Sequence, residues 1–241
     1  VSFQPSDLVD ENGELSASQK SALNNRLRII ALSGVKDIAL NCDHEVLCSY
    51  EDDTEDWVKK AAQHRKNYVG KPAEWVKLFK ATVNYCRDKG FNVVSISPFN
   101  EPDYTAWNQG PMSDFKEIAR LMREDEFFDS IRISGGNTLN CDEALKWYNG
   151  LSPYLDEGNT HQLAGSFDNY AKFFETVRAN GHHGTADELH NVMEAIVGVE
   201  YGMQTGIWWG YDGRARGQFC QATFGERLAY GEDRGHWTAA S

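Results

Sequence analysis

Two acidic side chains, each placed where a predicted strand ends, are the strongest chemical signal in the sequence. Glu101 follows a strand-like run in the stretch SPFNEPD, and Glu188 follows another in GTADELHN. Two facing carboxyl groups cleave a glycosidic bond when one protonates the leaving oxygen and the other attacks the anomeric carbon. A gap of about 5–5.5 Å suits this reaction, whereas about 6.5–9.5 Å leaves room for an attacking water. Such chemistry requires a fold that brings the two acids together.

Helical and strand-like patterns alternate along the chain, which predicts a parallel sheet with helical crossovers. The expected strands are 1–4, 36–43, 91–98, 131–134, 161–164, 183–187 and 206–209, and the expected helices are 16–30, 57–63, 72–89, 113–124, 142–148, 167–179 and 191–201. An open doubly wound sheet and a closed eight-stranded barrel both fit this order. No Gly-x-Gly-x-x-Gly follows the first strand, which weakens the nucleotide-binding open sheet.

Polar residues gather where the predicted strands end, and this favours a (β/α)8 TIM barrel, whose active site is built from those ends. They are Asn100, Glu101, Asn137, His161, Asp187, Glu188 and the segment 208–212. Glu101 and Glu188 end strands three apart, which face each other across the mouth of a closed barrel. Only seven strands are found. We therefore expect residues 1–241 to be one barrel domain that lacks its first strand and last helix in this chain.

Three motifs together resemble clan A of the retaining glycoside hydrolases, which are (β/α)8 barrels. They are SPFNEPD at the fourth strand of such a barrel, ADELHN at the seventh and GIWWG at the eighth. The resemblance implies that Glu101 is the general acid/base, that Asn100 binds the sugar 2-hydroxyl and that Glu188 is the nucleophile. It also implies that Trp208 or Trp209 floors the sugar subsite. Relatives in families 30, 5 and 39 are favoured, with none assigned.

The resemblance also implies the partners and the location of the protein. The expected substrate is an oligo- or polysaccharide, with no cofactor, and export to the periplasm or the medium is expected. Further domains outside this chain are left open. The net charge of −12 argues against nucleic acid and anionic membranes as partners. No apolar run is long enough to span a bilayer, and the first residues have no signal-peptide pattern.

Four further residues complete the expected substrate-binding set: Asn137, His161, Trp107 and His190. Asn137 could equally end a Gly-Gly turn, as Asn100 could belong only to its own turn. His161 could be a satisfied core histidine rather than a sugar ligand. Trp107 could lie on a surface loop, and one of the two adjacent tryptophans is expected to pack between barrel and helices.

The two acids also have simpler explanations. Glu101 could be a turn acid, and Glu188 could stabilise the N-terminus of helix 191–201 through its dipole. Asp187 competes with Glu188, because neighbours on a strand point to opposite faces and only one is expected to face the centre. We prefer Glu188. A displacement needs the pKa of Glu101 above that of Glu188, and basic or hydroxyl neighbours are expected to hold the latter down.

Two other functions remain open. A non-catalytic carbohydrate-binding barrel would use the same acids as hydrogen-bond acceptors. A metal-dependent hydrolase is suggested by His161, His182, His183 and His190, but no His-x-His occurs and DELHNVME is not a His-Glu-x-x-His motif. The five scattered cysteines include no Cys-x-x-Cys, so a zinc ribbon or redox pair is not expected. We therefore expect no metal ligand set.

Overall fold

The chain forms one parallel sheet whose strands follow each other in sequence order. The computed structural model describes residues 1–3, 5, 8–43, 68–104 and 109–209. The expected helix 57–63, Trp107 and the end of the segment 208–212 lie outside these residues. Each of the seven strands pairs in parallel with the next one, from β1 to β7. The predicted parallel sheet with crossovers is therefore confirmed.

The strands and helices lie close to the predicted positions. The strands are β1 (Ser2–Phe3), β2 (Asp37–Cys42), β3 (Asn92–Ser97), β4 (Arg132–Asn140), β5 (Glu157–Ala164), β6 (His183–Leu189) and β7 (Thr205–Trp208). The helices are α1 (Ala17–Ala31), α3 (Pro72–Asp88), α4 (Met112–Arg123), α5 (Cys141–Leu151), α6 (Phe167–Ala179) and α7 (Val192–Tyr201). Short 3-10 helices cover Glu126–Phe128 and Ser152–Tyr154.

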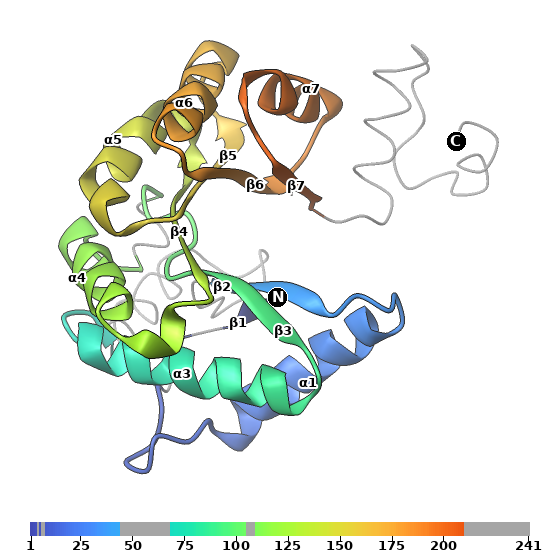
Figure 1. Cartoon of the computed structure of the whole chain (residues 1–241), viewed down its shortest axis with the longest axis vertical. Coiled ribbons are helices and arrows are strands. Elements are labelled where there is room, and N and C mark those ends of the chain that lie inside the picture. Colours follow the sequence, from blue (N-terminus) through green and yellow to red (C-terminus); the bar gives the residue numbers. More distant parts are fainter. Residues whose placement is uncertain (4, 6–7, 44–67, 105–108, 210–241) are drawn as a thin grey trace, which may run out of the picture.

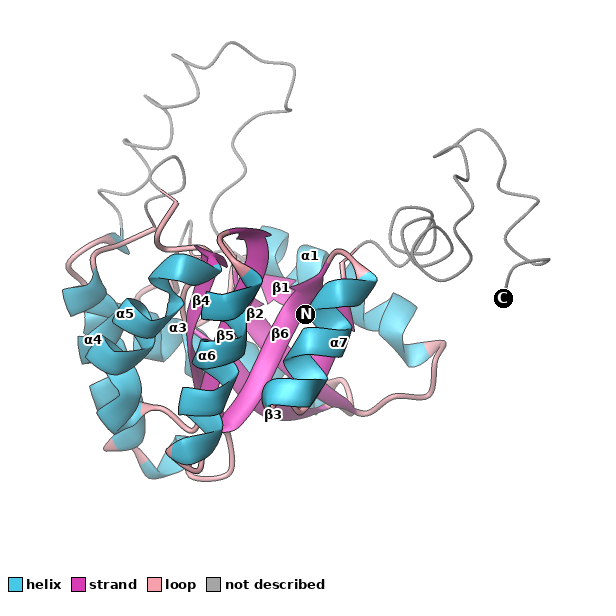
Figure 2. Cartoon of the chain, turned by 90° about the horizontal axis from the view of Figure 1, so that it is seen from above, coloured by secondary structure: helices cyan, strands magenta, loops and turns pink. Residues whose placement is uncertain are grey.

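The sheet is curled into part of a barrel. In Figure 1 the helices follow an arc from α1 and α3 through α4 and α5 to α6 and α7, with the strands on its inner side. Figure 2 shows α4, α5 and α6 side by side along the outside of the strands. This arrangement confirms the expected TIM-barrel-like α/β fold. Within the described residues, no helix combines the length and apolar character needed to cross a membrane.

Helix α3 shows how the sequence builds this fold. Pro72 stands in its first turn, where a missing N–H costs nothing. Its apolar face is fully covered by the sheet and by neighbouring helices, and consists of Trp75, Leu78, Phe79, Val83 and Cys86. In the turn after β3, the buried ring of Phe99 contacts Trp75, with 5.1 Å between ring centroids, and Phe115 of α4, with 4.9 Å. The turn after β3 is thereby anchored in the core.

The strand β4 runs further than the sequence predicts. Gly135 and Gly136 were expected to end it, yet it continues to Asn140. Gly136 has a φ of 90°, and a side chain there would lie 2.7 Å from the carbonyl oxygen of Asn159 in β5. The pairing of β4 with β5 is also irregular next to Gly136. The glycines therefore mark a close approach of two strands rather than a turn.

Substitution Phe99→Ala should lower the free energy of unfolding by about 3–5 kcal/mol, because it empties the space between two aromatic rings. Urea unfolding of the wild type and the variant measures this loss. Phe99→Leu is the matched control and should cost clearly less, since most of the apolar volume stays. A loss below about 1 kcal/mol for the alanine variant would show that Phe99 is not a core anchor.

Candidate active site

Glu101 lies in the turn that follows β3, and its side chain points into the protein. Its backbone has a φ of 47°, which is uncommon for a residue other than glycine. Its carbonyl oxygen accepts from the N–H of Tyr104 at 3.0 Å, as in a turn. The side chain is only 7% exposed. Glu101 is therefore a turn residue by its backbone, but not a solvated turn acid.

The next strand holds this turn in place. The N–H of Glu101 donates to the carbonyl oxygen of Asn137 at 2.8 Å. The two carboxylate oxygens of Asp103 accept from the N–H groups of Leu139 and Asn140 at 2.8 and 2.9 Å. Asn137 also has a φ of 46°. Two strained residues thus occur side by side, at a cost of about 1–3 kcal/mol each, which is typical of functional sites.

Three asparagine side chains join β2, the turn after β3 and β4. Asn41 donates to Oδ1 of Asn100 at 2.8 Å, and Nδ2 of Asn137 donates to Oδ1 of Asn41 at 3.1 Å. Asn137 also donates to the carbonyl oxygen of Phe99 at 3.1 Å. Asn100 and Asn137 are 3% and 0% exposed. In this arrangement Asn137 is a buried partner of the turn after β3, and its expected contact with a sugar stays a prediction.

Glu188 lies in β6, and Glu194 is the acid in the first turn of α7. The alternative that Glu188 only stabilises the start of that helix is therefore wrong. The register between β6 and β7 shifts between Ala186 and Leu189. As a result both Asp187 and Glu188 turn toward His161. The expectation that only one of the two faces the centre is wrong, because the irregular pairing breaks the alternation of the strand.

His161 of β5 joins the acids of the two sides. Its Nδ1 lies 2.9 Å from Oε1 of Glu101, and its Nε2 lies 2.9 Å from Oδ1 of Asp187. A carboxylate oxygen of Glu188 lies 3.8 Å from Nδ1. The imidazole ring is fully buried. His161 is thus a fully buried residue with partners on both ring nitrogens, and its expected contact with a sugar stays a prediction.

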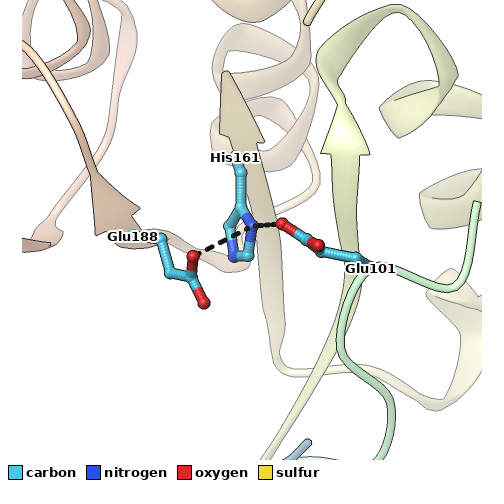
Figure 3. Close-up of side chains that lie close together, drawn as sticks. All are labelled: Glu101, His161 and Glu188. Carbon is cyan, nitrogen blue, oxygen red and sulfur yellow. Dashed lines mark hydrogen bonds and ion pairs between the residues drawn. The ribbon is translucent and has the colours of Figure 1, made fainter. Parts of the chain in front are cut away.

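The carboxyl groups of Glu101 and Glu188 lie close to each other on either side of His161 (Figure 3). One oxygen of each, together with Nδ1 of His161, forms a group whose members are all within 4.8 Å. This oxygen–oxygen separation is nearer to the spacing of retaining glycosidases than to that of inverting ones. The strand order explains it, since β3 and β6 are three strands apart in a curled sheet.

The surroundings of Glu188 disfavour its negative charge. Burial raises its pKa most, and the charges of Asp187, Glu101 and Asp43 raise it further, against the opposite effect of His161, to about 8. No hydrogen bond to its carboxylate comes from the described part of the chain, where its ion pairs involve only His161 and His190. The expectation that its neighbours hold this pKa down is therefore wrong.

His161 and Asp187 are shifted in opposite directions and support each other's charge. Burial alone would lower the pKa of His161, but the charge of Glu188 and the bonds to Asp187 and Glu101 outweigh it and raise the pKa well above the usual value. Burial alone would likewise raise the pKa of Asp187. The hydrogen bond and the charge of His161 outweigh that effect and hold it below its usual range.

A cavity of about 580 Å³ lies on the concave side of the sheet. Asp187, Glu188, Trp208 and Trp209 are among the residues that line it. Trp208 is half-buried and packs against the core, as one of the two tryptophans was expected to do, and Trp209 is 51% exposed. Both tryptophans thus line the same cavity as Asp187 and Glu188, and its volume is large enough for a sugar ring.

The last predicted site residue is His190. Its ring Nε2 lies 3.9 Å from the carboxylate of Glu188, and its backbone N–H donates to the carboxylate of Glu194 at 2.8 Å. Sequence reasoning missed Asn41 and Asp43, which end β2 and line the cavity. The strand-end criterion that selected Glu101 would have found both, had it been applied to the segment 36–43.

The described residues contain one group of side chains that could hold a divalent metal ion: Glu101, His161 and Glu188. Imidazole nitrogen and carboxylate oxygen are suitable ligands for zinc. Both ring nitrogens of His161, however, already lie at hydrogen-bonding distance from carboxylates. A metal would have to displace the bond between His161 and Glu101. We therefore assign no metal ligands.

Comparison with known proteins gives no family. No family model matches the sequence, and no curated protein matches it. Among solved structures, a glycoside hydrolase family 30 subfamily 8 xylanase from Clostridium acetobutylicum is 15% identical, with a TM-score of 0.44; 87% of this chain and 62% of the xylanase are covered. A candidate α-L-fucosidase from Bacteroides thetaiotaomicron is 9% identical, with a TM-score of 0.40 and coverages of 99% and 90%.

A member of the enolase superfamily from Agrobacterium tumefaciens is similar to the same degree. It is 7% identical, with a TM-score of 0.45, and 79% of this chain and 46% of that protein are covered. The chain spans less than two thirds of the length of this protein and of the xylanase. The matches include different classes of enzyme at low similarity, so they assign no activity. The resemblance to clan A stays a prediction.

The raised pKa of Glu188 can be tested without any substrate. Between about pH 4.5 and pH 8 the folded state keeps a proton on Glu188 that the unfolded state has lost, so this residue destabilises the fold as the pH rises through that range. Glu188→Gln removes the effect. The free energy of unfolding of this variant, relative to that of the wild type, should increase by about 3 kcal/mol between pH 6 and pH 9.

Urea unfolding at the two pH values measures this difference. Glu175→Gln, on the exposed face of α6, is the control and should give the same difference at both. If Glu188→Gln also gave the same difference at both pH values, Glu188 would be ionised throughout.

Proposed function

We propose that the protein is a retaining glycoside hydrolase that cleaves β-linked glycans by double displacement. The observation that carries this proposal is the separation of at most 4.8 Å between carboxylate oxygens of Glu101 and Glu188. Both acids are contributed by strand ends of a barrel-like sheet, where such enzymes assemble their sites. The adjacent tryptophans of β7 offer flat apolar faces on which a sugar ring can stack.

The roles that the resemblance implies fit this geometry. Glu101 donates a proton to the oxygen of the leaving group while Glu188 attacks the anomeric carbon, which forms a glycosyl-enzyme and releases the first product. Glu101 then takes a proton from water, and the water oxygen attacks the same carbon and frees Glu188. One water is consumed, and the sugar keeps its configuration after two inversions.

The surroundings of Glu188 add a condition to this mechanism. The nucleophile must be ionised, and the pKa of Glu188 is raised to about 8. The rate should therefore increase as the pH rises through that value. A substrate that binds over Glu188 displaces water and changes the field there, so the value in the complex can differ from that in the free enzyme.

Two substitutions distinguish the roles. Glu188→Gln should leave no detectable turnover, because the amide is not a nucleophile. Glu101→Ala should lower turnover of unactivated glycosides by about 10²–10⁴-fold, but spare substrates whose leaving group needs no proton. Added azide should then yield a β-glycosyl azide from that variant. Nitrophenyl glycosides and a panel of β-linked polysaccharides provide the assays.

Glu143→Gln, in an exposed pair with Lys146, is the matched control and should behave as the wild type. Full activity of Glu101→Ala on unactivated glycosides would make the role of Glu101 wrong. Sugar binding in calorimetry, with no product released by the wild type, would instead favour the non-catalytic carbohydrate-binding barrel.

A metal-dependent hydrolase is the second candidate, because the same three side chains bring a nitrogen and two oxygens within 4.8 Å of one another. Extensive dialysis against a chelator separates the two functions. The displacement mechanism predicts unchanged activity after dialysis, with metal content below one equivalent by mass spectrometry. Loss of activity that returns on addition of zinc or manganese would favour the second candidate.

A further inference from the structure

The contacts of His161 extend beyond the pair of glutamates. One ring nitrogen contacts Glu101 and the other contacts Asp187, each at 2.9 Å, so that three side chains form one hydrogen-bonded row. The row joins the turn after β3 to β5 and β6. Its central ring is fully buried, so no water competes for either bond. The resemblance to clan A assigns no role to Asp187.

We propose that Asp187 and His161 are positioning residues that assist Glu101 when it gives up its proton. This proposal rests on the proposed function. Asp187 is not required to touch the substrate. It acts through His161, which it orients and whose positive charge it balances.

The hydrogen count of the row supports this role. An ionised carboxylate can only accept, so the contact with Asp187 places a hydrogen on Nε2 of His161. The contact with Glu101 needs a second hydrogen, between Nδ1 and Oε1. With that hydrogen on nitrogen, the ring is an imidazolium that donates to Glu101. With it on oxygen, the ring is neutral and accepts.

The imidazolium form explains the assistance. When Glu101 passes its proton to the leaving oxygen, a negative charge forms on the carboxylate. The hydrogen bond from His161 then becomes charge-assisted on both sides and strengthens as the reaction proceeds. An interaction that strengthens toward the transition state accelerates the step. The proton leaves Glu101 for the leaving group, and the one on His161 stays in place.

Several other groups act on this row, among them the amino group of Val1, whose charge acts on Asp187. Glu188 lies 3.8 Å from its Nδ1, His190 lies beyond Glu188, and Asp43 acts from the end of β2. No lysine or arginine of the described residues forms an ion pair with Asp187 or Glu188. When its ring is protonated, His161 brings a positive charge into direct contact with Glu101.

The test compares two leaving groups in the Asp187→Asn variant. Asparagine keeps an acceptor oxygen for Nε2 but loses the negative charge. We expect kcat/KM to fall by about 10–100-fold for an alkyl glycoside, whose departure needs an acid, and by less than about threefold for a 2,4-dinitrophenyl glycoside. His161→Gln should show the same split. Both assays are run on the plateau of the pH profile, where Glu188 is ionised.

Asp103→Asn is the matched control. It also alters a partly buried carboxylate of the turn after β3, but this carboxylate accepts backbone N–H groups and has no hydrogen bond to His161. It should lower both activities by the same factor. An equal loss on both substrates in Asp187→Asn, or no loss on either, would overturn the proposal.

A second measurement keeps this proposal separate from the proposed function. Nitrogen NMR of 15N-labelled histidine reports whether both ring nitrogens of His161 carry hydrogen. At pH 8 we expect an imidazolium in the wild type and a neutral ring in Asp187→Asn. If the wild type cleaved no glycoside, the proposed function would fail while this result could still stand. A neutral ring in the wild type would show that His161 does not join Glu101 and Asp187 as an imidazolium, and would overturn the proposal.

Discussion

The structure depends on one buried imidazole that lies among three acids. The carboxylates of Glu101 and Glu188 lie within 4.8 Å of each other at their nearest ligand oxygens. Two full charges at that distance repel each other by about 3 kcal/mol at an effective dielectric constant of 20. His161 contacts the acids from both sides of the sheet. The ring lets them approach, and the proton on Glu188 removes the rest of the repulsion.

The backbone is adapted to keep this arrangement. Two non-glycine residues with positive φ, Glu101 and Asn137, occur where the turn after β3 meets β4. Asp103 and the asparagine cluster hold the turn against release of this strain. On the other side, the irregular register of β6 turns two consecutive acids toward the same ring. The site is therefore assembled by departures from regular geometry on both of its sides.

The sequence predicts regular features well and these departures poorly. The apolar stripes of α3 and α6 and the glycines after them define those helices almost to the residue, because each face is buried uniformly. Glu101 and Glu188 could be singled out because each stands at the end of a strand that the sequence also predicts. Alternation could not reveal that Asp187 and Glu188 share a side, since a register shift depends on pairing with β7. The raised pKa of Glu188 was not predicted, because it depends on burial and on acids from separate strands.

The energetics of Glu188 favour a reactive site over a site that only binds. A binding site for neutral sugars needs hydrogen-bond acceptors, and acceptors are stable when they are hydrogen-bonded or exposed to water. Glu188 is largely buried, is surrounded by acids and receives no hydrogen bond from the described residues. A group held in such a state destabilises the fold, and strongly perturbed acids cluster where chemistry needs them. The negative charge of Glu188 is disfavoured in the free protein. Such a carboxylate is better suited to form a covalent bond with a substrate than to accept a single hydrogen bond.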